Sequence, residues 1–389
     1  PGGARERKGG KAMRKFPVIY MRGGTSKGCM FLKKDLPEDR SQWDHIFLQV
    51  MGGPDPKQID GLGGTVSSNN KILIVSPSSR PDADVDYLVA QVVVGQPIVD
   101  YSANCGNMTA AVGPFAVMTG LVPAAEPVTK VRMYNENSGK VIEEFVPVKD
   151  GQVEEEGDCA IAGIDGTGAE LKVNFLSPAG AKTGKLLPTG SVRDEVLVEG
   201  LGKTIQVSAV DISNIFVFIR ASDLGMRGDE LPAEIAGSKA LLENIECVRG
   251  KIAQKCGLVE DWRDAAAKTA GSPKVVLFSQ PRDYTDIAGR PVKAEDMDIC
   301  VRVISVGQPH KASPMTAATA IGGAAFLDGC VMASCLRPLS GEAVRIAHPS
   351  GAMKVYVDRE GSGEGIRFRG IAGQRTARKI MDGTVYIKD

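Results

Sequence analysis

The stretch Asn104-Cys105-Gly106-Asn107-Met108-Thr109-Ala110-Ala111 ends in a phrase that returns as Met315-Thr316-Ala317-Ala318. Each copy of the phrase opens a run of small and apolar residues that is long enough for a helix and carries almost no charge. A helix that is apolar on every side is a buried helix. A phrase that is repeated in the two halves of a chain indicates a duplicated half-domain. We therefore expect two similar lobes, each built around one buried helix.

The residues that precede the two copies differ. Cys105 in the first copy aligns with Ala312 in the second, where the phrase follows Lys311-Ala312-Ser313-Pro314. One lobe therefore keeps a thiol where the other carries a methyl group. This asymmetry predicts two similar lobes that face one cleft, with unequal chemistry on its two sides.

The length and composition of the chain limit the classes of function that it can have. A chain of 389 residues predicts two or three domains, because a single core seldom grows so large. Lys plus Arg equals Asp plus Glu at 47 each, so no net field favours nucleic acid or an anionic membrane surface. No apolar run is long enough to span a bilayer. The eight cysteines include no C-x-x-C pair, which is typical of reduced thiols in a cytoplasmic protein.

Short β-branched runs, punctuated by Gly and Pro, predict strands along most of the chain. The fold class that we expect is therefore α+β, with a curled, mostly antiparallel sheet around a central helix in each lobe. The expected N-terminal lobe is 13–187 and the C-terminal lobe 188–389, with the last ~15 residues free to return to the first lobe. The predicted strands are Val18–Met21, Ile72–Val75, Leu88–Val94, Lys130–Tyr134, Ile205–Val210, Ile215–Ile219, Lys274–Phe278, Asp298–Ile304 and Met353–Val357.

The starts of the two buried helices are candidate carboxylate sites, because the first turn of a helix leaves N–H groups unpaired and carries a partial positive charge. At the first start, Gly106 allows close backbone approach and the same field favours the thiolate of Cys105. At the second start we expect Ser313 to cap the helix and Pro314 to occupy its first position. The alternative for Cys105 is a buried small hydrophobic residue, the commoner fate of a free cysteine.

The polar loop from Gly61 to Asn70 runs straight into the apolar strand Ile72–Val75, with Lys71 at the mouth of the strand. A lysine amine that is partly desolvated at such a position can serve as a general base. The serines and asparagines beside Lys71 favour a binding loop. The alternative is a solvated residue at the end of a strand.

The segment Met21-Arg22-Gly23-Gly24-Thr25-Ser26-Lys27-Gly28 superficially resembles a phosphate loop, but its residues are in the wrong order for a Walker motif. We interpret it as a glycine-supported anion loop that uses N–H groups, hydroxyls and Arg22. A Gly-rich turn between two strands explains the pattern equally well. Only three histidines are present, none at metal-ligand spacing, and no G-x-S-x-G occurs, so we expect neither a metal site nor a serine hydrolase.

Four motifs taken in order resemble the PrpF family, which includes 2-methylaconitate cis-trans isomerases, methylitaconate Δ-isomerases and 4-oxalomesaconate tautomerases. The resemblance runs from about Met13 to the C-terminus and implies the diaminopimelate-epimerase-like fold with cofactor-free proton transfer. Epimerases of this fold use one cysteine from each lobe, and Ala312 departs from that pattern, which disfavours a two-thiol racemase. The motifs are Met21–Gly28, Ser67-Ser68-Asn69-Asn70-Lys71, Asn104–Met108 and Ser313-Pro314-Met315-Thr316.

By this resemblance, Lys71 and Cys105 are expected to be the catalytic pair, with Lys71 removing a proton from an unsaturated di- or tricarboxylate. Either Lys71 or Cys105 then returns the proton. 2-Methylaconitate is the expected substrate, with 4-oxalomesaconate and methylitaconate as alternatives. The residues expected to bind substrate are Arg22, Thr25, Ser26, Ser67, Ser68, Asn69, Asn104, Gly106, Asn107, Met108, Lys274, His310, Ser313 and Met315.

A rival from another class is a non-catalytic accessory protein that binds an aconitase-like iron–sulfur enzyme and uses its cleft only to hold ligand. Deuterium incorporation from heavy water into substrate distinguishes the two, because only an isomerase catalyses it. The sequence leaves both a homodimer and a homotetramer open.

Overall fold

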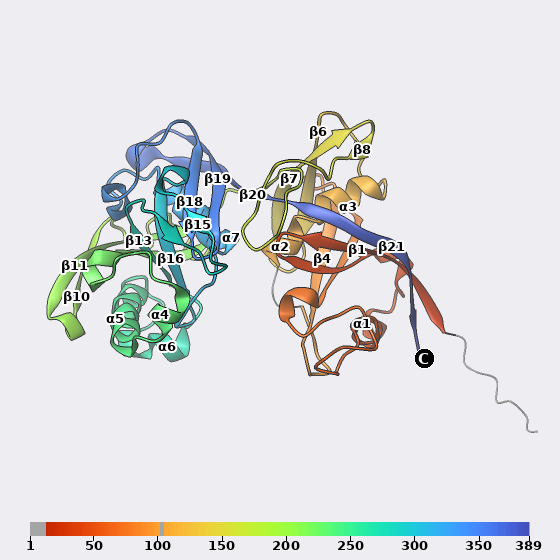
Figure 1. Cartoon of the computed structure of the whole chain (residues 1–389), viewed down its shortest axis with the longest axis horizontal. Helices are drawn as coiled ribbons and strands as arrows, with labels where there is room; N and C mark the ends of the chain where they lie inside the picture. The colour runs from red at the N-terminus through yellow and green to blue at the C-terminus, as the bar shows by residue number, and fades with distance from the viewer. Residues whose placement is uncertain (1–12, 102–104, 389) are drawn as a thin grey trace, which may run out of the picture. The chain divides into compact units, whose positions relative to one another are not determined.

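The computed structural model describes residues 13–101 and 105–388 (Figure 1). The chain forms two compact units. Unit 1 comprises residues up to Ala160, Ile164–Val173 and Arg375 onward, and unit 2 comprises Ile161–Gly163 and Asn174–Gln374. Within the described part of the chain, no helix has the length and apolar character needed to cross a membrane.

In unit 1 the strands follow the spatial order β21-β1-β2-β3-β4-β6-β7. The pairs β2–β3 and β4–β6 are parallel, and the other pairs in this order are antiparallel. The bounds are β1 Arg14–Gly23, β2 Ser26–Leu32, β3 Lys71–Pro77, β4 Val85–Val92, β5 Val99–Asp100, β6 Val128–Asn135, β7 Lys140–Lys149, β8 Gln152–Val153, β9 Leu171–Leu176 and β21 Ala377–Ile387.

In unit 2 the order is β10-β11-β12-β13-β16-β18-β19-β20, again with two parallel pairs, β12–β13 and β16–β18. The bounds are β10 Asp194–Val198, β11 Lys203–Ile212, β12 Asn214–Arg220, β13 Lys274–Ser279, β14 Tyr284–Thr285, β15 Pro291–Val292, β16 Ile299–Ser305, β17 Gln308–Pro309, β18 Ala343–His348, β19 Gly351–Glu360 and β20 Arg367–Arg375.

The alternation of pair directions is the same in both units. In each unit the helical segment with the repeated phrase lies in the chain between the two strands of the second parallel pair. β4 and β6 flank α2 (Gly106–Thr109) and α3 (Val112–Met118), as β16 and β18 flank α7 (Met315–Ala324). The topology therefore contains the duplication that the repeated phrase predicted. Each predicted strand coincides with a strand of the structure or overlaps one.

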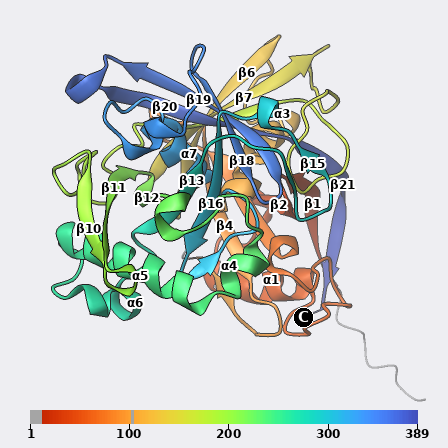
Figure 2. The ribbon, with the colours of Figure 1, turned by 60° about the vertical axis from the view of Figure 1, so that its left-hand side comes forward.

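The remaining helices lie on the connections. In unit 2, α4, α5 and α6 lie side by side between β12 and β13 in the chain (Figures 1 and 2). The bounds of the remaining helices are α1 Trp43–Met51, α4 Pro232–Ala236, α5 Lys239–Lys255 and α6 Ala265–Lys268.

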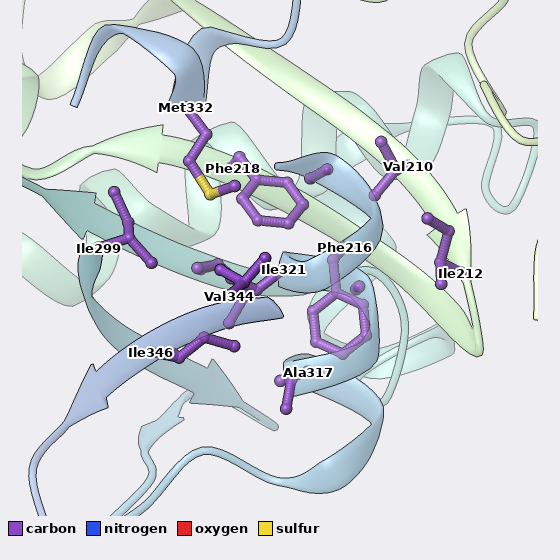
Figure 3. Close-up of a cluster of buried hydrophobic side chains, with 14 of the residues drawn as sticks. Val210, Ile212, Phe216, Phe218, Ile299, Ala317, Ile321, Met332, Val344 and Ile346 are labelled. Atoms are coloured by element: carbon purple, nitrogen blue, oxygen red, sulfur yellow. The ribbon is translucent and has the colours of Figure 1, made fainter. Parts of the chain in front are cut away.

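The helix α7, Met315–Ala324, is the centre of unit 2, and Ala317 and Ile321 project from it into the main apolar cluster (Figure 3). Gly322 and Gly323 permit its close approach to the sheet. A Cβ on Gly322 would lie 2.9 Å from Val355 Cγ2, and one on Gly323 would overlap Ile212. Packing thus offsets the low helix propensity of the two glycines.

The corresponding helix of unit 1 is broken into α2, Gly106–Thr109, and α3, Val112–Met118. The expected effect of Pro114 is a kink within one helix, but the break comes earlier, at Ala110–Ala111. Two backbone bonds of the helical ladder are missing here, because Pro114 has no N–H and the N–H of Gly113 donates to Glu144 Oε2 over 2.8 Å. The buried carboxyl of Glu144 on β7 therefore takes the place of a helical carbonyl.

Candidate active site

One row of directly opposed residues crosses four strands of unit 1. Gly28 on β2 pairs with Lys71 on β3, Lys71 pairs with Gln91 on β4, and Gln91 pairs with Asp100 on β5. Opposed residues in a sheet project from the same face. The side chain of Lys71 is half-buried in this row, and its Nζ donates a hydrogen bond to Gln91 Oε1.

The loop before Lys71 is built around a buried asparagine. Asn70 Nδ2 donates to the carbonyls of Gly64 and Val66 over 2.6 and 2.8 Å, and its Oδ1 accepts from the N–H of Gly64 over 3.1 Å. These bonds fix a single 3-10 turn, Ser67–Asn69, directly before β3. Ser67 is exposed, whereas Ser68 and Asn69 are half-buried. Three of the predicted binding residues therefore share one turn beside Lys71.

The turn between β1 and β2 carries three further predicted residues. Arg22 uses Nη1 within the fold, donating to Gly24 O and to both oxygens of Thr376 at 3.0 Å each. Burial, followed by the neighbouring charge of Arg378, lowers the pKa of Arg22. Thr25 is exposed, and Ser26 is buried at 5% exposure. The hydrogen bonds of Arg22 therefore stabilise the turn, and of the three residues Thr25 is the one with an exposed hydroxyl.

The Cys105 segment packs against this turn. Thr25 Oγ1 accepts a hydrogen bond of 2.9 Å from Asn107 Nδ2. Cys105 is the N-cap of α2 and is half-buried, and its carbonyl accepts the N–H of Thr109 over 2.9 Å. Gly106 and Asn107 are in the first turn, so their N–H groups have no acceptor within the helix. The predicted residue Asn104 lies outside the described residues.

The Lys71 loop and the Cys105 segment both contact the chain at the start of β2. Gly28 pairs with Lys71, and Thr25, just before β2, contacts Asn107. The structure thus brings the Lys71 loop and the Cys105 segment to the same end of one strand.

A buried guanidinium interacts electrostatically with Cys105. Arg375 is 9% exposed, and burial lowers its pKa to about 10, partly offset by interaction with Cys105 and Cys159. It directly precedes Thr376, whose carbonyl accepts the N–H of Gly24 over 3.0 Å. No local pattern marks Arg375, because it is about 270 residues from Cys105 along the chain.

Unit 2 contains a separate group of cations. Burial and the charge of Lys182 lower the pKa of Lys274 at the start of β13. Partial desolvation and then the charge of Lys274 lower the pKa of His310, whose Nδ1 accepts the N–H of Ala312 over 3.1 Å. The loop that carries Lys182 is held by Asp211, whose Oδ2 accepts the N–H groups of Lys182 and Thr183. Lys182 was not predicted, since nothing in its local pattern marks it.

The start of α7 differs from the prediction. Ser313 does not cap the helix, because Pro314 is the N-cap with φ −58° and ψ 150°, so that the helix begins at Met315 and Ser313 is one residue too early. Ser313 is 5% exposed, and its Oγ has no hydrogen-bond partner among the described residues. The side chains of Met108 and Met315 are both buried, in contrast to the exposed hydroxyl of Thr25. Unit 2 thus offers an unpartnered hydroxyl beside a helix start.

Across residues 13–101 and 105–388, no group of three His, Cys, Asp or Glu side chains is arranged to hold a metal ion. The arrangement in unit 1 is an amine and a thiol set among hydroxyls and first-turn N–H groups. Such a set can remove a proton from carbon and stabilise the resulting negative charge.

Comparison with known proteins places this chain among isomerases. The profile described as PrpF protein matches residues 13–388. A 3-methylitaconate isomerase from Eubacterium barkeri is 40% identical over 377 residues, covering 96% of this chain and 97% of that protein. A 2-methyl-aconitate isomerase from Shewanella oneidensis is 40% identical over 387 residues, with 96% and 97% covered. A 4-oxalomesaconate tautomerase from Pseudomonas putida is 39% identical over 375 residues, with 96% of each covered.

A solved structure, titled as methylitaconate-delta-isomerase, superposes with a TM-score of 0.88 at 38% identity, covering 97% of this chain and 96% of that one. The superposition and the matching strand topology of the two units confirm the expected α+β fold with a duplicated half.

Proposed function

Because this chain belongs to the PrpF protein family, we propose that it is a cofactor-independent isomerase that shifts an allylic proton in an unsaturated tricarboxylate, with 2-methylaconitate as substrate. The observation that carries the proposal is the position of Lys71. Its amine is held at the end of a strand, next to a turn of hydroxyl and amide side chains and within the same unit as the Cys105 segment.

Lys71 removes the allylic or γ proton, and the electron pair of the broken C–H bond spreads over an extended dienolate onto a carboxylate. The N–H groups of Gly106 and Asn107 stabilise that charge, together with the hydroxyls of Ser68 and Thr25. They contribute more in the transition state than in the ground state, because the charge develops during the reaction. Rotation, or return of the proton at the other allylic carbon by Lys71 or Cys105, completes the isomerisation.

Unit 2 by itself carries a second set of groups suited to binding a carboxylate. Lys274 and His310 supply positive charge or donors, and Ser313 supplies a hydroxyl that is otherwise without a partner among the described residues. The main chain at Met315 adds a first-turn N–H.

The test is the Lys71→Ala variant, with Lys149→Ala on the exposed end of β7 as the matched control. Lys71→Ala is expected to remain folded by circular dichroism and to lose nearly all isomerase activity, whereas Lys149→Ala keeps it. Activity at the wild-type level in Lys71→Ala would reject Lys71 as the base.

The substrate is decided by assaying 2-methylaconitate, 4-oxalomesaconate and methylitaconate side by side through their ultraviolet absorbance. The second and third substrates are the alternatives, since relatives at 39% and 40% identity carry those names. Deuterium incorporation from heavy water into all active substrates is expected. Its absence for every substrate would favour the non-catalytic accessory protein.

A further inference from the structure

Gln91 is the hydrogen-bond acceptor of the Lys71 amine, and its orientation is fixed by its other contacts. Nε2 of Gln91 donates to the carbonyl of Asn70 over 3.1 Å and to the carbonyl of Val92 over 2.9 Å. Carbonyl oxygens only accept, so the nitrogen of the amide must face them. Oε1 is therefore the atom that faces Lys71 Nζ, and it accepts a hydrogen bond from it.

The contacts of Gln91 also connect Lys71 to the binding loop. Asn70, whose carbonyl holds the Gln91 amide, is the fully buried residue that braces Gly64 and Val66. The same carbonyl accepts the N–H of Val92 over 3.1 Å, which fixes Asn70 against β4. Movement of the loop would therefore disturb the Gln91 amide and, through it, the amine.

An amide is suited to this position by its charge. A carboxylate at the same place would stabilise the ammonium form of lysine, and an ammonium group cannot accept a proton. A neutral amide oxygen holds the amine in place without adding that stabilisation. Asp100 on β5, which pairs with Gln91, is the acidic residue in the row of opposed residues Gly28, Lys71, Gln91 and Asp100. Lys27 precedes Gly28 on β2. Gln91 therefore stands between Lys71 and the carboxylate of the row.

We infer that Gln91 is a positioning residue for proton transfer: it holds the Lys71 amine toward the substrate and keeps a neutral acceptor next to it. This inference rests on the proposed role of Lys71 as the base.

The main test is Gln91→Glu, which keeps the length of the side chain and replaces the amide with a carboxylate. It is expected to move the acid limb of the pH profile of kcat/KM upward by about one pH unit. Asp100→Asn, which removes the other carboxylate of the row, is expected to move that limb less or in the opposite direction. Gln96→Glu, on an exposed position after β4, is the matched control and leaves the profile unchanged.

The second variant is Gln91→Leu, which removes the acceptor at similar volume. We expect kcat to fall by about 10-fold or more, with KM changed by less than about 3-fold, because the amine is misplaced while the carboxylate-binding groups remain. A loss that appears only in KM would contradict the inference.

A measurement that does not depend on enzymatic turnover distinguishes this inference from the proposed function. Acylation of Lys71 by acetic anhydride, followed by peptide mass spectrometry, reports the fraction of free amine as a function of pH. Gln91→Glu is expected to slow the labelling of Lys71 relative to Lys149 at the same pH. Unchanged labelling together with an unchanged pH profile would overturn the role of Gln91 alone. Full activity of Lys71→Ala would overturn the proposed function and, with it, the role of Gln91 in proton transfer, whatever the labelling shows. If Gln91→Glu does not fold, the kcat and KM of Gln91→Leu decide the matter.

Discussion

Asn107 Nδ2 donates a hydrogen bond of 2.9 Å to Thr25 Oγ1, which joins the start of α2 to the turn between β1 and β2. The two residues are 82 positions apart in the chain. The bond matters for the proposed chemistry because it aligns the first-turn N–H groups of α2 with the hydroxyl of Thr25.

Replacing the Thr25 hydroxyl should therefore affect activity more than stability. Thr25→Val keeps the β-branched shape and removes the acceptor, and we expect kcat/KM to fall by about 10-fold. Because Thr25 is exposed, the free energy of unfolding should change by less than about 1 kcal/mol. Steady-state kinetics and urea unfolding measure both quantities. Thr25→Ser, which keeps a hydroxyl, is the control, and equal activity of all three proteins would remove the bond from the mechanism.

Cys105 is expected to contribute less than Lys71. Cys105→Ala should lose activity to an extent that depends on the substrate, because a thiol that returns the proton matters only where Lys71 does not return it. The measurement is the rate of each variant on the three candidate substrates, with Cys256→Ala in unit 2 as the control thiol. Rates that match the wild type on every substrate would assign Cys105 to packing alone.

Gly28 has no room for a side chain. A Cβ at this position would lie 2.7 Å from the carbonyl carbon of Lys71 and 2.8 Å from its Cβ, so the parallel pair β2–β3 must separate to accept it. We expect Gly28→Ala to lower the free energy of unfolding by about 1–3 kcal/mol and to reduce activity, because Lys71 is displaced. Gly383→Ala on β21 is the matched control, since no atom lies within 4 Å of its added Cβ. Denaturant titrations of equal midpoint for the two variants would contradict this expectation.

Glu144 makes the stability of the protein depend on pH. Burial raises the pKa of Glu144 from 4.5 to about 8, which outweighs the opposing effect of the bond from Gly113 N–H. Between these two values the folded protein keeps the proton and the unfolded chain loses it, so the free energy of unfolding falls as the pH rises from about 4.5 to about 8. Below about pH 4.5 the carboxyl of Glu144 is protonated in both the folded and the unfolded state, so it does not lower the free energy of unfolding.

The variant Glu144→Gln keeps an oxygen for Gly113 and does not titrate. We expect its stability relative to the wild type to increase between about pH 5 and about pH 8, as measured by urea unfolding at both values. Glu143→Gln, on the neighbouring position of β7, is the control. A constant difference between Glu144→Gln and the wild type at the two pH values would show that the carboxyl is ionised in the folded protein.

Several features of the fold were predictable because they depend on local pattern. The run Ile72–Val75 is apolar and rich in β-branched residues, and it forms the buried part of β3. The apolar circumference after Met315 predicted a buried helix, and Ala317 through Gly323 are indeed buried in α7. The break between α2 and α3 was not predictable in the same way, because the carboxyl that takes the Gly113 N–H comes from Glu144, 31 residues further on.

The sequence by itself determined the duplication, the strands, and the residue types of the candidate site around Lys71 and Cys105, since repeats, alternation and glycine-rich polar loops are properties of contiguous residues. Only the tertiary structure decided that Gln91 faces Lys71, that Arg375 is buried, and that Ser313 lies before the cap of α7 and not at it. The physical reason is strand register. Which residue of one strand stands opposite which residue of the next is set by the packing of the whole sheet, and a shift of one position would turn Gln91 away from the amine.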